Sequence, residues 1–250
     1  MGDRRSHPAL TTEEAFDLVR RVAREVIGHE VKLPPRLDPS SLHGELDLEL
    51  GGEPQEAGAV VEQLTRILVA TPSAASQRFL NQLFGGRDPM ATLAEMLTPV
   101  TNTSMYTYKV AGPQVLIEQE VLRRMCGAVG FADGEGMLCP GGSMSNLTAL
   151  LLARNEAMPE GRDRGLDGRS LVVYTSADGH YSIPKNAGML GIGRRNVREV
   201  PVDRHGRMDV AELGRLLEED LAAHRQPVMI NATAGTTVLG AFDPLQAITD

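Results

Sequence analysis

Residues 171–182 have the sequence Leu-Val-Val-Tyr-Thr-Ser-Ala-Asp-Gly-His-Tyr-Ser and decide the fold class. The run Leu171–Tyr174 is apolar throughout, as is typical of strands buried on both faces of a parallel sheet. The polar residues after it, up to His180, would then lie at the carboxyl end of that strand, the edge at which open α/β sheets bind ligands. The stretch therefore predicts a parallel α/β fold with His180 beside a ligand. A histidine that only satisfies backbone at a helix terminus is the alternative.

Outward from this stretch, predicted strands and helices alternate. The strands are expected over 137–139, 171–174, 197–202 and 228–230, and the helices over 118–129, 143–155, 181–190 and 209–222. This alternation predicts right-handed βαβ units in a largely parallel sheet with flanking helices. A last helix is expected to begin at Pro244 with Asp243 as its cap. Because it has only about two turns before Asp250, we expect the chain to be the front part of a longer protein.

The first 75 residues follow a different pattern. Amphipathic helices are predicted over 12–27 and 56–69, with an irregular acidic segment over 37–54 between them. Two such helices are expected to pack on another element or another subunit rather than fold alone. The sequence therefore predicts a helical N-terminal arm, residues 1–75, followed by an α/β domain over residues 76–250.

The composition excludes several classes of protein. The 250 residues carry 25 Lys and Arg against 33 Asp and Glu, a net charge of −8, whereas nucleic-acid-binding proteins normally have the opposite sign. No apolar run approaches the ~20 residues that span a bilayer, and the first ten residues lack the pattern of a secretory signal. Two cysteines form no disulfide framework, and the scattered histidines suggest no metal site. These features predict a cytoplasmic protein without a nucleic-acid or membrane partner.

A glycine motif precedes the helix predicted over 143–155. It has the sequence Cys139-Pro140-Gly141-Gly142-Ser143 and follows a predicted strand. The two glycines allow the backbone to approach a ligand closely, and the start of a helix offers unpaired N–H groups to a phosphate. For this motif alone, a plain turn with Ser143 as N-cap is the simpler interpretation, because short glycine motifs often match by chance.

A third polar segment, Asn231–Thr237, follows the buried strand predicted over 228–230. It holds three hydroxyl side chains and one glycine, and by itself it is consistent with an ordinary polar loop. Three such loops in consecutive βα units meet at the same edge of a parallel sheet. Together they predict a site for a phosphorylated ligand.

In order and spacing, these motifs resemble those of the group II pyridoxal-phosphate decarboxylases, most closely the members that act on glutamate and cysteine sulfinate. The resemblance is carried by five segments, 79–84, 102–108, 141–143, 180–182 and 231–244. It extends from about Arg78 to Asp250, and the order of its motifs is far more specific than any single glycine motif. The first 75 residues match only loosely, through the helical arm.

The resemblance implies a fold-type I, pyridoxal-phosphate-dependent transferase-like domain, incomplete at its C-terminus, in an enzyme that is usually a homodimer. It also implies the site residues: Gly142 and Ser143 for the cofactor phosphate, His180 for stacking on the pyridine ring in catalysis, Thr237 for a further cofactor contact, and Asn81 and Gln82 for the substrate carboxylate. The reaction implied is decarboxylation of an acidic or polar amino acid. During it the cofactor ring takes up the electron pair that CO2 leaves.

Two residues that the family uses have no counterpart in this sequence. By the resemblance, the aspartate at the pyridine nitrogen and the lysine that bonds the cofactor both fall beyond Asp250. Among the three lysines, Lys185 alone shares a predicted helix with the His180 motif, and the family does not place the cofactor bond there. Two alternatives follow: a non-catalytic chain with a dimerising or regulatory role, and a fold-type I enzyme of another reaction, such as aminotransfer or carbon–sulfur cleavage.

Overall fold

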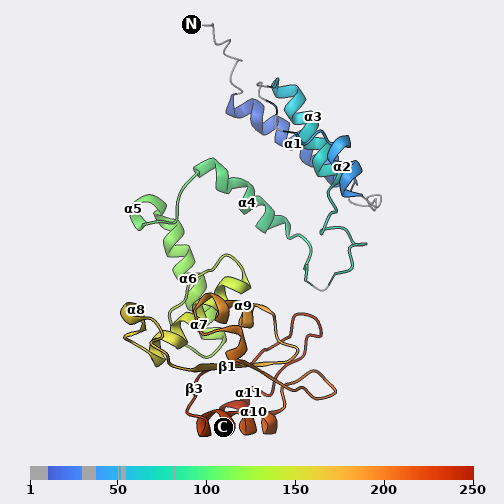
Figure 1. Ribbon diagram of the computed structural model, residues 1–250. Helices are drawn as coiled ribbons and strands as arrows, with labels where there is room; N and C mark the ends of the chain where they lie inside the picture. Colours follow the sequence, from blue (N-terminus) through green and yellow to red (C-terminus); the bar gives the residue numbers. More distant parts are fainter. Residues whose placement is uncertain (1–10, 30–37, 50, 52–54, 82) are drawn as a thin grey trace. The chain divides into compact units, whose positions relative to one another are not determined.

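The computed structural model describes residues 11–29, 38–49, 51, 55–81 and 83–250 (Figure 1). The chain divides into two compact units, one ending at Thr101 and one formed by Asn102–Asp250. The described part of the first unit is helical, with α1 (Thr12–His29), α2 (Pro39–Glu45), α3 (Ala57–Ala70) and α4 (Pro89–Thr101). The limit predicted at residue 75 between arm and domain falls within this unit, between α3 and α4.

The two amphipathic helices predicted in the arm are confirmed as α1 and α3, which pack against each other. A capping box begins α1, because the Thr11 hydroxyl accepts the Glu14 N–H at 3.2 Å and the Glu14 carboxylate accepts the Thr11 N–H at 2.8 Å. An apolar cavity of about 620 Å³ is lined by residues of α1, α3 and α4, among them Val22, Leu64 and Met96. The described helices of the first unit therefore border apolar space that they do not fill.

The segment 37–54, predicted to be irregular, contains the helix α2, so that prediction is wrong. Asp38 is its N-cap and accepts the Ser41 N–H at 3.2 Å, while Pro39 occupies the first turn. A capping carboxylate and a proline at the first helical position both favour a helix start. This local pair of signals outweighs the polar composition of the segment.

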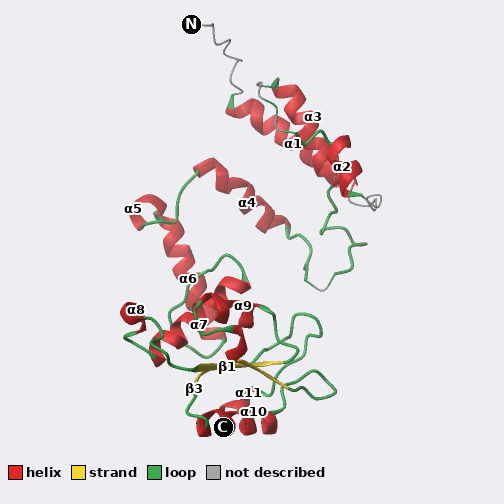
Figure 2. Ribbon diagram, viewed as in Figure 1, coloured by secondary structure: helices red, strands yellow, loops and turns green. Residues whose placement is uncertain are grey.

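The second unit is a three-layer α/β domain (Figure 2). Its helices are α5 (Tyr108–Ala111), α6 (Pro113–Ala128), α7 (Gly142–Ala157), α8 (Gly161–Arg164), α9 (Ser182–Met189), α10 (Val210–Ala222) and α11 (Leu245–Thr249), and its strands are β1 (Leu171–Ser176), β2 (Val197–Val200) and β3 (Gln226–Asn231). The strands form a parallel sheet in the order β2-β1-β3. The predicted parallel α/β fold class is confirmed.

The central strand β1 is buried along its whole length, as its apolar sequence predicts. Its side chains alternate between two cores. Leu171 and Val173 pack with residues of α7 and α9, whereas Val172 and Tyr174 pack with residues of α10. Figure 1 shows α7 and α9 on one side of the sheet and α10 and α11 on the other. The carboxyl end of β1 therefore lies between two helix layers.

The short strand predicted over 137–139 is wrong. No strand is assigned there, and the Met137 side chain is 65% exposed and that of Leu138 57% exposed. A strand exists only through hydrogen bonds to a neighbour, and none of the described strands pairs with this segment. The helix that follows it does form, as α7.

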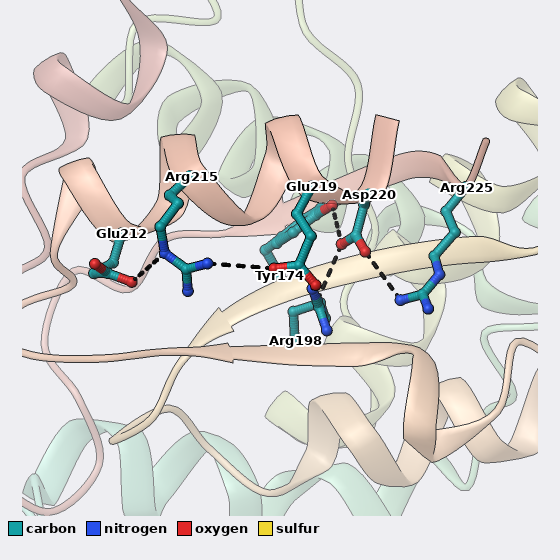
Figure 3. Close-up of polar contacts among 7 residues, drawn as sticks. All are labelled: Tyr174, Arg198, Glu212, Arg215, Glu219, Asp220 and Arg225. Carbon is teal, nitrogen blue, oxygen red and sulfur yellow. Dashed lines mark hydrogen bonds and ion pairs between the residues drawn. The ribbon is translucent and has the colours of Figure 1, made fainter. Parts of the chain in front are cut away.

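The layer of α10 is joined to the sheet through a buried carboxylate, Asp220, which is 0% exposed (Figure 3). The Tyr174 hydroxyl donates to its Oδ2 at 2.7 Å, and Nη1 of Arg225 donates to its Oδ1 at 3.0 Å. Nε of Arg198 is 3.1 Å from Oδ2, a charge contact in which the N–H does not point at the oxygen. One carboxylate thus links α10 to both β1 and β2.

Charge pairs extend this cluster toward the surface (Figure 3). Arg198 also donates to Glu219 at 2.7 Å and thereby lowers the pKa of that exposed carboxyl, and Arg215 bridges Glu219 and Glu212. Burial, followed by the hydrogen bond to Asp220, raises the pKa of the Tyr174 phenol above its ordinary value of 10.0. Tyr174 therefore remains a neutral hydrogen-bond donor at physiological pH.

Candidate functional site

The start of α7 has the geometry of an anion site. Gly141 has φ of 95°, a conformation that favours glycine, and a Cβ on Gly141 or Gly142 would meet no atom within 4 Å. The carbonyl of Gly141 accepts the N–H groups of Met144 and Ser145. Within the described chain, the N–H groups of Gly142 and Ser143 have no backbone acceptor. Two free donors at the positive end of a 16-residue helix can bind a phosphate.

The second motif places His180 just past the carboxyl end of β1, where it is half-buried and lies two residues before the start of α9. Its Nδ1 lies 2.8 Å from the Ser182 hydroxyl and 3.2 Å from the Ser182 backbone nitrogen. The rings of His180 and Tyr181 have centroids 4.3 Å apart. Contacts on one edge of the imidazole therefore fix its orientation at the end of the sheet.

Two asparagines join these motifs across α7 and α9. Nδ2 of Asn146 donates to the Ser182 hydroxyl at 2.8 Å, and Nδ2 of Asn186 donates to the Ser143 carbonyl at 2.9 Å. Ser182 and Asn186 are buried. These bonds hold the start of α7, with its free N–H groups, close to the loop that carries His180. Sequence analysis missed Asn146 and Asn186, whose partners lie 36 and 43 positions away.

The third motif joins the same edge through β3. Nδ2 of Asn231 donates to the Thr175 hydroxyl of β1 at 3.2 Å. A Cβ on Gly179 would lie 2.6 Å from that hydroxyl oxygen, so the His180 loop also closes over Thr175. Downstream, Thr236 is buried and its hydroxyl accepts the Ala241 N–H at 3.0 Å, whereas Thr237 is exposed. All three polar loops thus meet at one edge of the sheet.

Asp243 has a different role from the predicted helix cap. Its side chain is 3% exposed, and its two oxygens accept the N–H groups of Met208 at 2.7 Å and Thr233 at 2.8 Å. The helix α11 begins at Leu245 with no side-chain cap. The cap prediction is wrong because two backbone donors from distant loops occupy the carboxylate. Asp243 thereby fixes the loop after β3 to the segment that precedes α10.

Replacing Asp243 with asparagine should lower the free energy of unfolding by about 2 kcal/mol, because one N–H would then face an amide donor instead of a charged acceptor. Urea unfolding measures the change, and hydrogen exchange at the Thr233 amide locates it. Asp133→Asn, at an exposed carboxylate, is the matched control and should change stability by less than about 0.5 kcal/mol. Equal stability of the two variants would contradict the role of Asp243.

The substrate residues predicted upstream, Asn81 and Gln82, fall in the unit that ends at Thr101. Asn81 lies in the first unit, where its Oδ1 accepts the Leu83 N–H at 2.8 Å, and Gln82 lies outside the described residues. Lys109 and Lys185 are exposed, and Lys32 lies outside the described residues. Neither described lysine has the desolvated environment that favours a cofactor-bonding amine.

The described residues contain no group of three His, Cys, Asp or Glu side chains placed to hold a metal ion. None of their helices combines the length and the hydropathy that crossing a bilayer requires.

Residues 39–250 match the protein family described as "Pyridoxal-dependent decarboxylase conserved domain". The chain is 42% identical over 214 residues to cysteine sulfinic acid decarboxylase of Homo sapiens, covering 85% of this chain and 43% of that protein. It is 38% identical over 214 residues to glutamate decarboxylase of Drosophila melanogaster, covering 85% and 42%. The crystal structure of mouse CSAD in apo form has a TM-score of 0.86 at 39% identity, over 93% of this chain and 52% of that chain.

The second unit is a three-layer α/β domain with a helix N-terminus suited to a phosphate and a histidine at the sheet edge. This combination is that of a cofactor-binding domain. The chain belongs to the pyridoxal-dependent decarboxylase family. It spans about two fifths of the length of the curated relatives named above. The residues present fit pyridoxal phosphate: the free N–H groups at Gly142 and Ser143 suit its phosphate, and the half-buried imidazole of His180 suits a flat ring.

Proposed function

We propose that the whole protein is a pyridoxal-phosphate-dependent decarboxylase of an acidic or polar amino acid, such as cysteine sulfinate, glutamate or aspartate. The observation that carries the proposal is the set of hydrogen bonds that joins α7 to α9 and β3 to β1 beside the sheet edge where His180 lies. The relatives at 38–42% identity are named for cysteine sulfinate and glutamate, which supports a substrate with a second acidic group.

In this proposal each site residue of the chain has one task. Gly142 and Ser143 bind the cofactor phosphate, His180 stacks on the ring, and Thr237 makes a further cofactor contact. Asn81 and Gln82 bind the substrate carboxylate. The bound cofactor supplies an electron sink for the bond that releases CO2. The junction around His180 holds the ring contact rigid, so that the bond to be broken stays oriented.

The experiment that tests this function uses the purified full-length protein. It is incubated with pyridoxal phosphate and, separately, with cysteine sulfinate, glutamate and aspartate, and the CO2 released is measured together with the amine product. Release of CO2 from at least one acidic substrate is expected. Formation of a keto acid without CO2 would instead identify an aminotransferase, and no reaction with any of them would favour a non-catalytic role.

Replacing Ser143 with alanine should weaken binding of pyridoxal phosphate about ten-fold, because one hydrogen bond to a charged group contributes about 1.5 kcal/mol. Absorbance titration of the cofactor-free protein measures the dissociation constant. Ser145→Ala is the matched control on the same helix, since the Ser145 hydroxyl only approaches the Gly141 carbonyl at 3.4 Å. Equal affinities of the two variants would exclude the Ser143 hydroxyl, though not its backbone N–H, from binding the phosphate.

We also propose that the protein is a cytoplasmic homodimer. Both cysteines, Cys126 and Cys139, are free, as is common in a reducing compartment. The apolar side chains of Leu116, Ile117 and Met125 on α6 are at least half exposed within this chain, which favours a second chain over that surface. Sedimentation equilibrium of the full-length protein distinguishes the dimer from a monomer.

A further inference from the structure

Two donors from Ser182 converge on one ring nitrogen of His180. The backbone N–H of Ser182 points at Nδ1 with a nitrogen–nitrogen distance of 3.2 Å, and the Ser182 hydroxyl oxygen lies 2.8 Å from the same atom. A backbone N–H can only donate, so Nδ1 must be the acceptor and carries no proton. The backbone alone therefore indicates which nitrogen is unprotonated.

The direction of the neighbouring bonds follows from that assignment. With no proton on Nδ1, the Ser182 hydroxyl must donate to it, which leaves the hydroxyl oxygen as an acceptor. Nδ2 of Asn146 fills that place at 2.8 Å. Ser182 is 0% exposed, so water does not compete for these groups. The result is a one-way chain of donors from Asn146 through Ser182 to His180.

We propose that Asn146 and Ser182 are positioning residues that hold His180 as the tautomer protonated at Nε2. A neutral imidazole has one ring proton, and Nδ1 is occupied by donors. Among the described residues, none forms a hydrogen bond with Nε2. The ring thus presents an N–H donor to the ligand and selects an acceptor oxygen there. The identity of that ligand rests on the proposed function, whereas the tautomer does not.

The tautomer can be read directly from the full-length protein labelled with 15N in its histidine rings. Solid-state NMR separates protonated from unprotonated ring nitrogens, and the difference from His180→Gln identifies the signals of His180. We expect an unprotonated Nδ1 and a protonated Nε2 in the cofactor-free protein. A proton on Nδ1 would overturn the proposal.

Asn146→Asp tests the donor chain with little change of shape. A carboxylate has no N–H to offer, so the Ser182 hydroxyl turns to donate to it and presents its lone pair to Nδ1. The Ser182 backbone N–H then remains as the one donor to Nδ1, so we expect the Nδ1 signal of His180 to shift to that of a weaker hydrogen bond and, in an active enzyme, kcat to fall about ten-fold, the loss of one hydrogen bond. An unchanged His180 spectrum would overturn the role of Asn146.

Asn196→Asp is the matched control, because Asn196 is partly buried and its amide donates to the Ile192 carbonyl at 2.7 Å, away from His180. Its His180 spectrum should equal that of the parent protein, and the same change in both variants would overturn the specific role of Asn146.

Should Asn146→Asp fail to fold, Ser182→Ala provides a second test. It removes the hydroxyl but keeps the backbone donor, so the Nδ1 signal should shift to that of a weaker hydrogen bond. An unchanged Nδ1 signal would contradict the chain.

Two arms separate this proposal from the proposed function. Adding pyridoxal phosphate alone, and then the substrate amino acid, shows which of the two perturbs the Nε2 signal and so supplies the acceptor oxygen. A protein with the expected tautomer but without CO2 release would retain this inference and reject the decarboxylase. CO2 release by a protein with a proton on Nδ1 would support the decarboxylase and reject the proposed tautomer.

Discussion

Asp220→Asn is expected to lower the free energy of unfolding by about 3 kcal/mol, because it removes the charge on which a buried cluster converges. The carboxylate is 0% exposed and touches Tyr174, Arg198 and Arg225. We expect the low end of the range for broken buried pairs, since the side chains of Arg198 and Arg225 are 23% and 41% exposed and Arg198 keeps Glu219 as a partner. Urea unfolding of the two proteins measures the difference.

Glu218→Gln is the matched control for this prediction, because Glu218 is an exposed carboxylate on the same helix, two residues earlier. It should change stability by less than about 0.5 kcal/mol. Tyr174→Phe removes only the hydroxyl that donates to Asp220 and should cost about 1 kcal/mol. A loss in Asp220→Asn no larger than that of Tyr174→Phe would show that the arginine contacts contribute little.

Gly179→Ala is expected to have the second large effect, on both stability and cofactor binding. A Cβ at this position would lie 2.6 Å from the Thr175 hydroxyl oxygen and 2.8 Å from the Ser176 carbonyl oxygen. The second contact is with backbone at the end of β1, so the turn must move, and His180 moves with it. Overpacking of this kind costs about 2 kcal/mol. Thermal unfolding and titration with pyridoxal phosphate measure the two effects.

Gly214→Ala gives the opposite sign and serves as the control. Gly214 lies inside α10, and a Cβ there would meet no atom within 4 Å. Because alanine favours the helix over glycine, we expect this variant to be more stable by up to about 1 kcal/mol. Unchanged stability and cofactor affinity in Gly179→Ala would show that the close approach to Thr175 does not constrain this position.

Three Asp-Pro pairs in the sequence show what a local helix-cap pattern can and cannot predict. Asp38 caps α2 before Pro39, and Asp88 caps α4 in the same way, accepting the Met90 and Ala91 N–H groups at 2.9 and 2.8 Å. Both helices were missed although the local signal was present. The third pair, Asp243-Pro244, predicts a helix cap, but the carboxylate of Asp243 accepts two distant backbone N–H groups instead of capping α11. A local cap pattern cannot reveal a competing tertiary partner.

The residues of the candidate site also fall into two groups, those that the sequence predicts and those whose role depends on tertiary partners. The apolar strand β1 brings His180 to the sheet edge, and the sequence predicts this from hydrophobic pattern and chain order. The strand predicted before Gly142 and Ser143 does not form, and a hydrogen bond from Asn186 to the Ser143 carbonyl joins the start of α7 to α9 instead. The residues that fix their geometry, Asn146 and Asn186, are ordinary polar positions on predicted helices. Their importance comes from partners on another helix, which periodicity does not encode.

The hydrogen bonds that assemble the site join residues 36, 43 and 56 positions apart. Closing chain segments of that length costs entropy before the contacts can stabilise anything. This edge of the sheet is therefore expected to form late, after β1 has paired with its neighbouring strands and the helices have packed on the sheet. A cofactor that needs the finished edge cannot guide the early steps of folding. It would instead slow unfolding and lengthen the lifetime of the native state, so the supply of pyridoxal phosphate would govern how long the folded protein lasts rather than how fast it folds.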